Sequence, residues 1–144
     1  MSARGERFTV KWRQPVYYSD FSDSFETNPT TGALQVLTNE ESISASIESL
    51  VMTSPGERPG RNGIGSKVLS SLFANLGMES DPQVEALRQS VMEVIQNHEP
   101  RAQNPRVVVD VSGIQDNEVR VSVSYRPINL PQVVEFTFSI QRVR

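Results

Sequence analysis

The sequence of 144 residues has no cysteine, a single histidine and no hydrophobic run of membrane-spanning length. Without cysteine the chain cannot form disulfides or thiolate metal sites. Because His98 is the only histidine, a histidine-rich zinc site is excluded and a nucleophilic triad would have one candidate base. The N-terminus, "MSARGERFTVKW", has no apolar run before a cleavage site. We therefore expect a soluble protein that matures in a reducing cytoplasm, with no metal and no cofactor.

Excess positive charge is also absent. The formal net charge is −3, which gives no electrostatic case for nucleic acid, and we expect no membrane partner. Lysine is scarce, since 12 of the 14 basic residues are arginine and only Lys11 and Lys67 are lysine. Arginine is favoured in protein interfaces, although a compositional bias of the host would explain the excess equally well.

Three segments repeat their apolar residues at the helical period of 3.6. They predict helices over residues 39–53, 65–76 and 81–98. Thr38 and Glu41 have the spacing of a capping box, in which each side chain binds a free backbone N–H at the start of a helix.

After residue 105 the period changes to two. Residues 106–114, 118–126 and 133–141 predict three strands, joined by a tight hairpin and a wider turn. Helices followed by a run of strands predict an α+β domain, with three helices packed on one face of a C-terminal three-stranded antiparallel meander. We expect this single domain to span 38–144, after an N-terminal arm and loop over 1–37.

The N-terminal part contains segments of different character. Residues 6–13 alternate apolar and polar positions, which predicts a short strand or an extended arm. Residues 19–32 are rich in Ser, Asp, Thr, Asn, Pro and Gly, which predicts a loop. The apolar piece "ALQVL" at 33–37 could add an edge strand.

Several segments imitate enzyme sites without meeting their requirements. In "GRNGIGSK", residues 60–67, Ser66 precedes Lys67 and the segment follows a helix, whereas a phosphate-binding loop needs Gly-Lys-Ser/Thr after a strand. Glycoside hydrolysis needs two carboxylates held across a cleft, and no spacing selects a pair among the available acids, which are Asp20, Asp23, Glu57 and Glu99. We expect no catalytic residue; a peptidoglycan-cleaving enzyme is the alternative.

The joint between the last predicted helix and the first long strand is Glu99-Pro100-Arg101. Proline disfavours helical geometry at the preceding residue, so we expect the chain to stay extended here. Glu99 and Arg101 would then project outward on similar sides without facing each other. A carboxylate and a guanidinium on a rigid joint suit bidentate contacts with a partner. A solvated helix end with an incidental charge pair is the other interpretation.

Two further surfaces are candidates for partner binding. The segment 54–65 has four glycines and two prolines, and it is either a long mobile loop or a docking loop that uses Glu57, Arg58 and Arg61. The last strand has no predicted cover, and an open edge can accept a strand from a partner. Its candidate residues are Phe136, Phe138, Arg142 and Arg144.

Several short motifs occur in order along the chain. They are "YSDF" (18–21), "TGAL" (31–34), "NEESISASIESLVMT" (39–53), Gly56-Glu57-Arg58, Gly65-Ser66, Leu69, Leu72-Phe73 and Glu99-Pro100-Arg101. Together they resemble the baseplate wedge proteins of contractile-tailed bacteriophages. That family also has a member in the baseplate of type VI secretion systems and is often labelled lysozyme-like. The resemblance covers about residues 17–141 and departs from the family pattern at Ile64 and Ala74.

The resemblance implies a structural protein. Members of the family lie in the inner baseplate around the tail tube, in hexagonal symmetry. Their Glu-Pro-Arg motif docks on the core bundle of wedge subunits, and their C-terminal sheet accepts strands from the first sheath ring and so initiates sheath assembly. We therefore expect other wedge subunits, the tail sheath protein and the tail tube as partners. The expected location is the virion tail baseplate, after assembly in the host cytoplasm.

Overall fold

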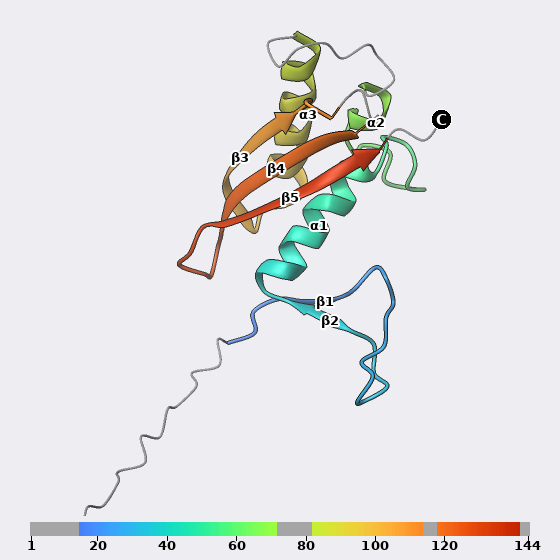
Figure 1. Cartoon of the computed structure of the whole chain (residues 1–144), viewed down its shortest axis with the longest axis vertical. Coiled ribbons are helices and arrows are strands. Elements are labelled where there is room, and N and C mark those ends of the chain that lie inside the picture. Colours follow the sequence, from blue (N-terminus) through green and yellow to red (C-terminus); the bar gives the residue numbers. More distant parts are fainter. Residues whose placement is uncertain (1–14, 72–81, 114–117, 142–144) are drawn as a thin grey trace, which may run out of the picture.

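The computed structural model in Figure 1 describes residues 15–71, 82–113 and 118–141. The predicted strand or arm over 6–13, the predicted helical residues 72–76 and the candidate residues Arg142 and Arg144 lie outside the described residues. The elements in chain order are β1 (Ser19–Phe21), β2 (Val36–Thr38), α1 (Glu40–Met52), α2 (Val68–Ser71), α3 (Pro82–His98), β3 (Ala102–Asp110), β4 (Glu118–Pro127) and β5 (Val134–Gln141).

A C-terminal antiparallel sheet with the strand order β3-β4-β5 confirms the predicted three-stranded meander and the α+β class. On β4 the side chains alternate as a half-buried strand requires: Val121 and Val123 are fully buried, whereas Arg120 and Arg126 are exposed. Ser122 and Thr137 lie opposite each other on the other face of the sheet, and their hydroxyls are 2.8 Å apart.

Strand β3 begins at Ala102, four residues before its predicted start. The pairing with β4 shifts register between Gln103 and Arg106, which is the mark of a β-bulge. Asn104 has a φ of +49° there, and Pro105, which cannot donate to a ladder, lies inside the bulge. Asn-Pro is a dipeptide common in turns, and here the bulge accommodates it within β3.

The helices and the sheet share one hydrophobic core. Helix α1 contributes Ile43, Ile47 and Val51 to it, all fully buried. The core residues of α3 and of the sheet include Leu87, Val91, Ile95, Val107, Val121, Val123, Phe138 and Ile140. Figure 1 shows α1 running from the β1–β2 hairpin towards the region of α2. The core therefore joins elements from both halves of the chain.

The start of α1 differs from the predicted capping box of Thr38 and Glu41. Asn39 occupies the N-cap position with φ of 48°, and no side chain caps the helix. The Asn39 side chain instead accepts a hydrogen bond from the Tyr17 N–H (2.8 Å) and donates one to the Pro15 carbonyl (3.0 Å). The capping-box prediction was wrong because Asn39, and not Thr38, occupies the N-cap position. The Asn39 side chain binds the backbone at Pro15 and Tyr17 and does not cap the helix.

Only the first three residues of the loop predicted over 19–32 form a strand, β1, and residues 22–32 are turns and irregular chain with one isolated bridge from Thr27 to Leu34. Strand β1 pairs with β2 in antiparallel fashion, and Phe21 lies opposite Val36. Both side chains remain about half exposed or more, at 60% and 49%. The apolar piece 33–37 thus contributes to a strand, but its partner is β1 and not the C-terminal sheet.

Two serines on α1 should respond to alanine substitution in opposite directions. The Ser42 hydroxyl is buried with no hydrogen-bond partner among the described residues, whereas the Ser46 hydroxyl donates to Glu99 Oε2 at 2.6 Å. An unpaired buried hydroxyl carries a desolvation penalty, and a bond to a charged group is worth about 1.5–3 kcal/mol. We expect Ser42→Ala to raise the free energy of unfolding and Ser46→Ala to lower it, in urea titrations of both variants. A loss of stability in Ser42→Ala equal to that in Ser46→Ala would contradict this.

Candidate docking site

The Glu99-Pro100-Arg101 joint is a tight turn and not an extended segment. Helix α3 ends at His98, and the Glu99 N–H still donates to the Ile95 carbonyl at 2.9 Å. The Ala102 N–H then donates to the Glu99 carbonyl at 3.1 Å. This closes a four-residue β-turn with proline at its second position, where its fixed φ is favoured. The prediction of an extended joint was wrong because the turn reverses the chain from α3 directly into β3.

The turn also brings Glu99 and Arg101 together, against the expectation that they project outward side by side. The Glu99 side chain is only 3% exposed, and Arg101 binds it with both Nε (2.6 Å) and Nη2 (2.7 Å). Ser46 from α1 adds a third donor. Arg101 itself remains 30% exposed. Glu99 is therefore an internal anchor, and Arg101 is the charged member of the motif that reaches the surface.

Arg101 connects this turn to the rest of the molecule. Its guanidinium lies over the ring of Tyr18, 5.3 Å from the centroid, which is a favourable cation–π distance. The Tyr18 hydroxyl accepts a hydrogen bond from Asn129 (2.8 Å), and the Ile128 N–H donates to the Arg101 carbonyl (3.0 Å). Four segments thus meet at one point: the residue just before β1, helix α1, the turn after α3, and the β4–β5 connection. Their contacts fix the position of the Arg101 guanidinium.

Hydrogen bonds and a neighbouring charge keep the Glu99 carboxyl group ionised. Burial alone would raise the pKa of Glu99, but the hydrogen bonds from Arg101 and Ser46 and the charge of Arg101 together hold that pKa below its usual value. The pKa of Arg101 is raised, chiefly by its hydrogen bonds to Glu99. Both groups are charged at neutral pH, and each stabilises the charged form of the other.

This ion pair predicts a loss of stability in acid. A group whose pKa is depressed by folding stabilises the native state above its unfolded pKa, and that contribution is lost as the pH falls through the folded pKa. We expect the stability difference between the wild type and Glu99→Gln to be constant near neutral pH and to shrink below the usual carboxyl value of 4.5. Urea titrations across the pH series measure it. A difference that grows on acidification would contradict the assignment.

The segment 54–65 is a closed loop with a fixed base. The Ser66 N–H donates to the Thr53 carbonyl (2.8 Å), and the Ser66 hydroxyl donates to the Val51 carbonyl (2.5 Å). Both bonds join the returning chain to the end of α1. Gly65 allows the returning chain to lie this close to the end of α1. Its φ is +130°, and a Cβ there would lie 2.5 Å from the Thr53 carbonyl oxygen. Such loops with adjacent ends are compact surface features.

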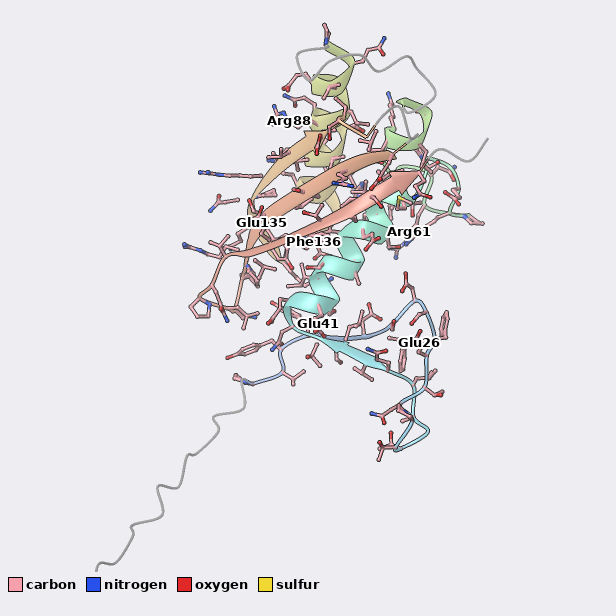
Figure 2. All side chains as sticks on the ribbon, viewed as in Figure 1. Glu26, Glu41, Arg61, Arg88, Glu135 and Phe136 are labelled. Carbon is pink, nitrogen blue, oxygen red and sulfur yellow. The ribbon has the colours of Figure 1, made fainter. Side chains whose placement is uncertain are left out.

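The three candidate residues of this loop differ in their contacts. Glu57 Oε2 accepts the Ser54 N–H at 2.8 Å, which supports the turn at the start of the loop. Arg58 Nη2 donates to the Ser49 hydroxyl of α1 at 3.1 Å. Arg61 is exposed, and Figure 2 labels it on the loop near the C-terminal end of α1. The loop presents Arg61 outward, while Glu57 and Arg58 also hold the loop itself.

The two aromatic candidates on β5 face the core more than a partner. Phe138 is 7% exposed and stacks on Phe136, with ring centroids 5.8 Å apart. Phe136 is partly buried against the core and meets the Tyr125 ring edge-on at 6.2 Å. Their binding role stays a prediction. At the outer edges of β3 and β5, no further strand is paired among the residues that the structure describes.

A groove between the β1–β2 hairpin and α1 was not predicted from the sequence. It has a volume of about 590 Å³, and its lining includes Asp20, Phe21, Asp23, Glu48 and Arg58. Burial raises the pKa of Glu48, and the neighbouring Asp23 raises it further. The acids lie on different elements, Asp20 and Asp23 in or next to β1 and Glu48 on α1, and only the position of the hairpin brings them together.

The described ranges contain no cluster of three or more His, Cys, Asp or Glu placed to hold a metal ion. Among the helices of those ranges, none has the length and apolar character needed to cross a membrane.

Comparison with known structures identifies the fold. A candidate tail lysozyme from Geobacter sulfurreducens, solved by crystallography at 1.44 Å, superposes with a TM-score of 0.65 at 19% identity, over 76% of this chain and 97% of that chain. A chain of the six-fold symmetrised cryo-EM structure of the anti-feeding prophage baseplate gives a TM-score of 0.53 at 20% identity, over 86% of this chain and 85% of that one. At these identities the likeness shows a shared fold.

The sequence itself carries the family assignment. No curated protein matches the chain. Residues 38–131, which are more than half of the chain, match the family described as baseplate wedge protein gp25. The match runs from the start of α1 through the Glu-Pro-Arg turn to the end of β4 and beyond. The chain therefore belongs to the gp25 family of structural baseplate wedge proteins.

Proposed function

We propose that this protein is a wedge subunit of a contractile-tail baseplate, located in the virion, which binds other wedge subunits through the Glu99-Pro100-Arg101 turn. The single observation that supports this best is the arrangement of the turn: Glu99 is sealed inside, and it holds an Arg101 that remains 30% exposed. A guanidinium with a fixed position gives directional contacts with carboxylates and carbonyls of a partner. The role of Glu99 is then to position Arg101 and not to contact the partner directly.

Arg101→Gln tests this role. Because the substitution removes the charge, it should abolish incorporation into wedge complexes when the variant is mixed with the other wedge subunits of its particle. Glu99 also loses its counter-charge, so the variant should be less stable, and incorporation is measured at a temperature at which its circular dichroism spectrum is native. Arg88→Gln is the matched control, since Arg88 also pairs with a carboxylate, Glu85, on the surface of α3. Normal incorporation of Arg101→Gln would refute docking through the turn.

The sheet edge supports a second part of the proposal, initiation of the sheath. Backbone N–H and C=O groups on an open edge can pair with an added strand, and no strand pairs with the outer edge of β5 among the described residues. Removing residues 132–144 is not a clean test, because Phe138 and Ile140 belong to the core. Hydrogen exchange of β5 amides with and without the sheath protein is cleaner. New protection along β5 is expected, and unchanged exchange would refute strand addition there.

The protein is proposed to act without catalysis. Glu99 is buried and ion-paired with a lowered pKa, whereas a general acid needs a raised one. Glu57 is exposed and bound to the backbone of its own loop. Neither can serve as the acid of a glycosidase.

One observation gives the alternative function, peptidoglycan cleavage, a specific candidate residue. Glu48 has a raised pKa and shares the groove with Asp23 and Asp20, which is the combination that peptidoglycan cleavage would use. Turnover of purified cell wall by the wild type, lost in Glu48→Gln, would favour this alternative. No turnover by the wild type is the outcome expected of a structural protein.

A further inference from the structure

The groove between the hairpin and α1 has the shape and chemistry of a docking surface. Small side chains of α1 form part of it, namely Ala45, Ser46 and Ser49, so that another backbone can approach the helix closely. At its sides Phe21 is 60% exposed and Met52 is 39% exposed. Large apolar side chains that line a concave surface indicate a site for another segment.

The charge of the groove indicates what would fill it. Asp20, Asp23 and Glu48 line it, and within the described residues none of the three takes part in an ion pair. Among the lining residues that the structure describes, Arg58 is the one cation, and it donates to Ser49 and Thr53. The mutual repulsion of Asp23 and Glu48 would be relieved by a cation beside them. The occupant should therefore be basic and carry apolar side chains.

We propose that the occupant is the N-terminal segment of the same molecule, residues 4–13. The sequence of this segment, "RGERFTVKWR", has four cationic residues and one acidic residue. Its apolar residues Phe8, Val10 and Trp12 alternate with polar ones. In an extended chain, alternate residues lie on opposite sides. The aromatic side would contact Phe21 and Met52, and the cationic side would meet the carboxylates.

The connection to the described chain makes this arrangement geometrically feasible. Asn39 holds the backbone at Pro15 and Tyr17, so the described chain begins beside the N-terminal end of α1. Helix α1 has 13 residues and is therefore about 20 Å long. Ten extended residues reach about 33 Å, which is enough to follow the groove along the whole helix.

Trp12 provides a direct test in the full-length protein, because it is the only tryptophan. If the segment is docked, Trp12 emission should be blue-shifted and protected from acrylamide relative to the urea-unfolded chain. The double variant Asp23→Asn/Glu48→Gln should lose both the shift and the protection while its far-UV circular dichroism spectrum stays native. High salt should weaken the protection in the wild type, since it screens the ion pairs.

The control is Glu135→Gln, which removes an exposed carboxylate on β5 that Figure 2 shows away from the hairpin; it should leave Trp12 protected. Three results would overturn the proposal. Trp12 that is fully accessible in the wild type excludes docking, and protection that survives the groove substitutions places the segment elsewhere. Protection that disappears on dilution assigns the segment to a second copy of the chain.

Discussion

Glu99→Ala should lower the free energy of unfolding by about 3 kcal/mol. The substitution removes an acceptor that two nitrogens of Arg101 and the Ser46 hydroxyl share. It leaves the guanidinium, which is 30% exposed, next to a new cavity without its counter-charge. Urea titration followed by far-UV circular dichroism measures the change.

Glu135→Ala is the matched control for this substitution. Glu135 is an exposed carboxylate on β5, and surface substitutions of this kind usually change stability by less than about 0.5 kcal/mol. Equal effects of Glu99→Ala and Glu135→Ala would mean that Glu99 is not the buried anchor of the turn.

Gly65→Ala should destabilise the protein by about 3 kcal/mol or more, through a different mechanism. The backbone of Gly65 has a φ of +130°, which a residue with a Cβ rarely adopts, and the added Cβ would lie 2.5 Å from the Thr53 carbonyl oxygen and 2.8 Å from the Ser54 carbonyl carbon. Both contacts are with backbone, so the loop base has to open. The hydrogen bonds from Ser66 to Thr53 and Val51 would then be lost.

Gly60→Ala in the same loop separates backbone strain from the steric clash. Gly60 also has a positive φ, +78°, but a Cβ there meets nothing within 4 Å. Its substitution should cost only about 1 kcal/mol. If thermal or urea unfolding gives the same loss for both variants, the close approach at Gly65 does not contribute.

The regular elements were predictable because their periodicity is a direct consequence of burial on one face. The predicted helix over 81–98 corresponds to α3, Pro82–His98, and the strand over 118–126 corresponds to β4, Glu118–Pro127. Strand β1 gave no such signal, since its residues are all exposed, whereas β2 overlaps the apolar piece 33–37 that indicated an edge strand. A segment that buries little has no period to detect.

The site could be located in the sequence, but its geometry could not be predicted. The Glu-Pro-Arg motif was recognisable, yet the decision between an extended joint and a β-turn depends on a single bond, from the Ala102 N–H to the Glu99 carbonyl. That turn buries Glu99 and places Arg101 over Tyr18, about 80 residues earlier in the chain. Contacts between such distant residues follow from the tertiary fold and leave no local pattern.

A high-resolution cryo-EM reconstruction of the native baseplate tests the central claim most directly, namely that a buried Glu99 positions Arg101 for another subunit. In this reconstruction Glu99 should be bonded within its own chain, and the Arg101 guanidinium should lie within hydrogen-bond distance of a neighbouring wedge subunit. A reconstruction in which Arg101 faces solvent, while the wedge contacts lie on other surfaces, would contradict it.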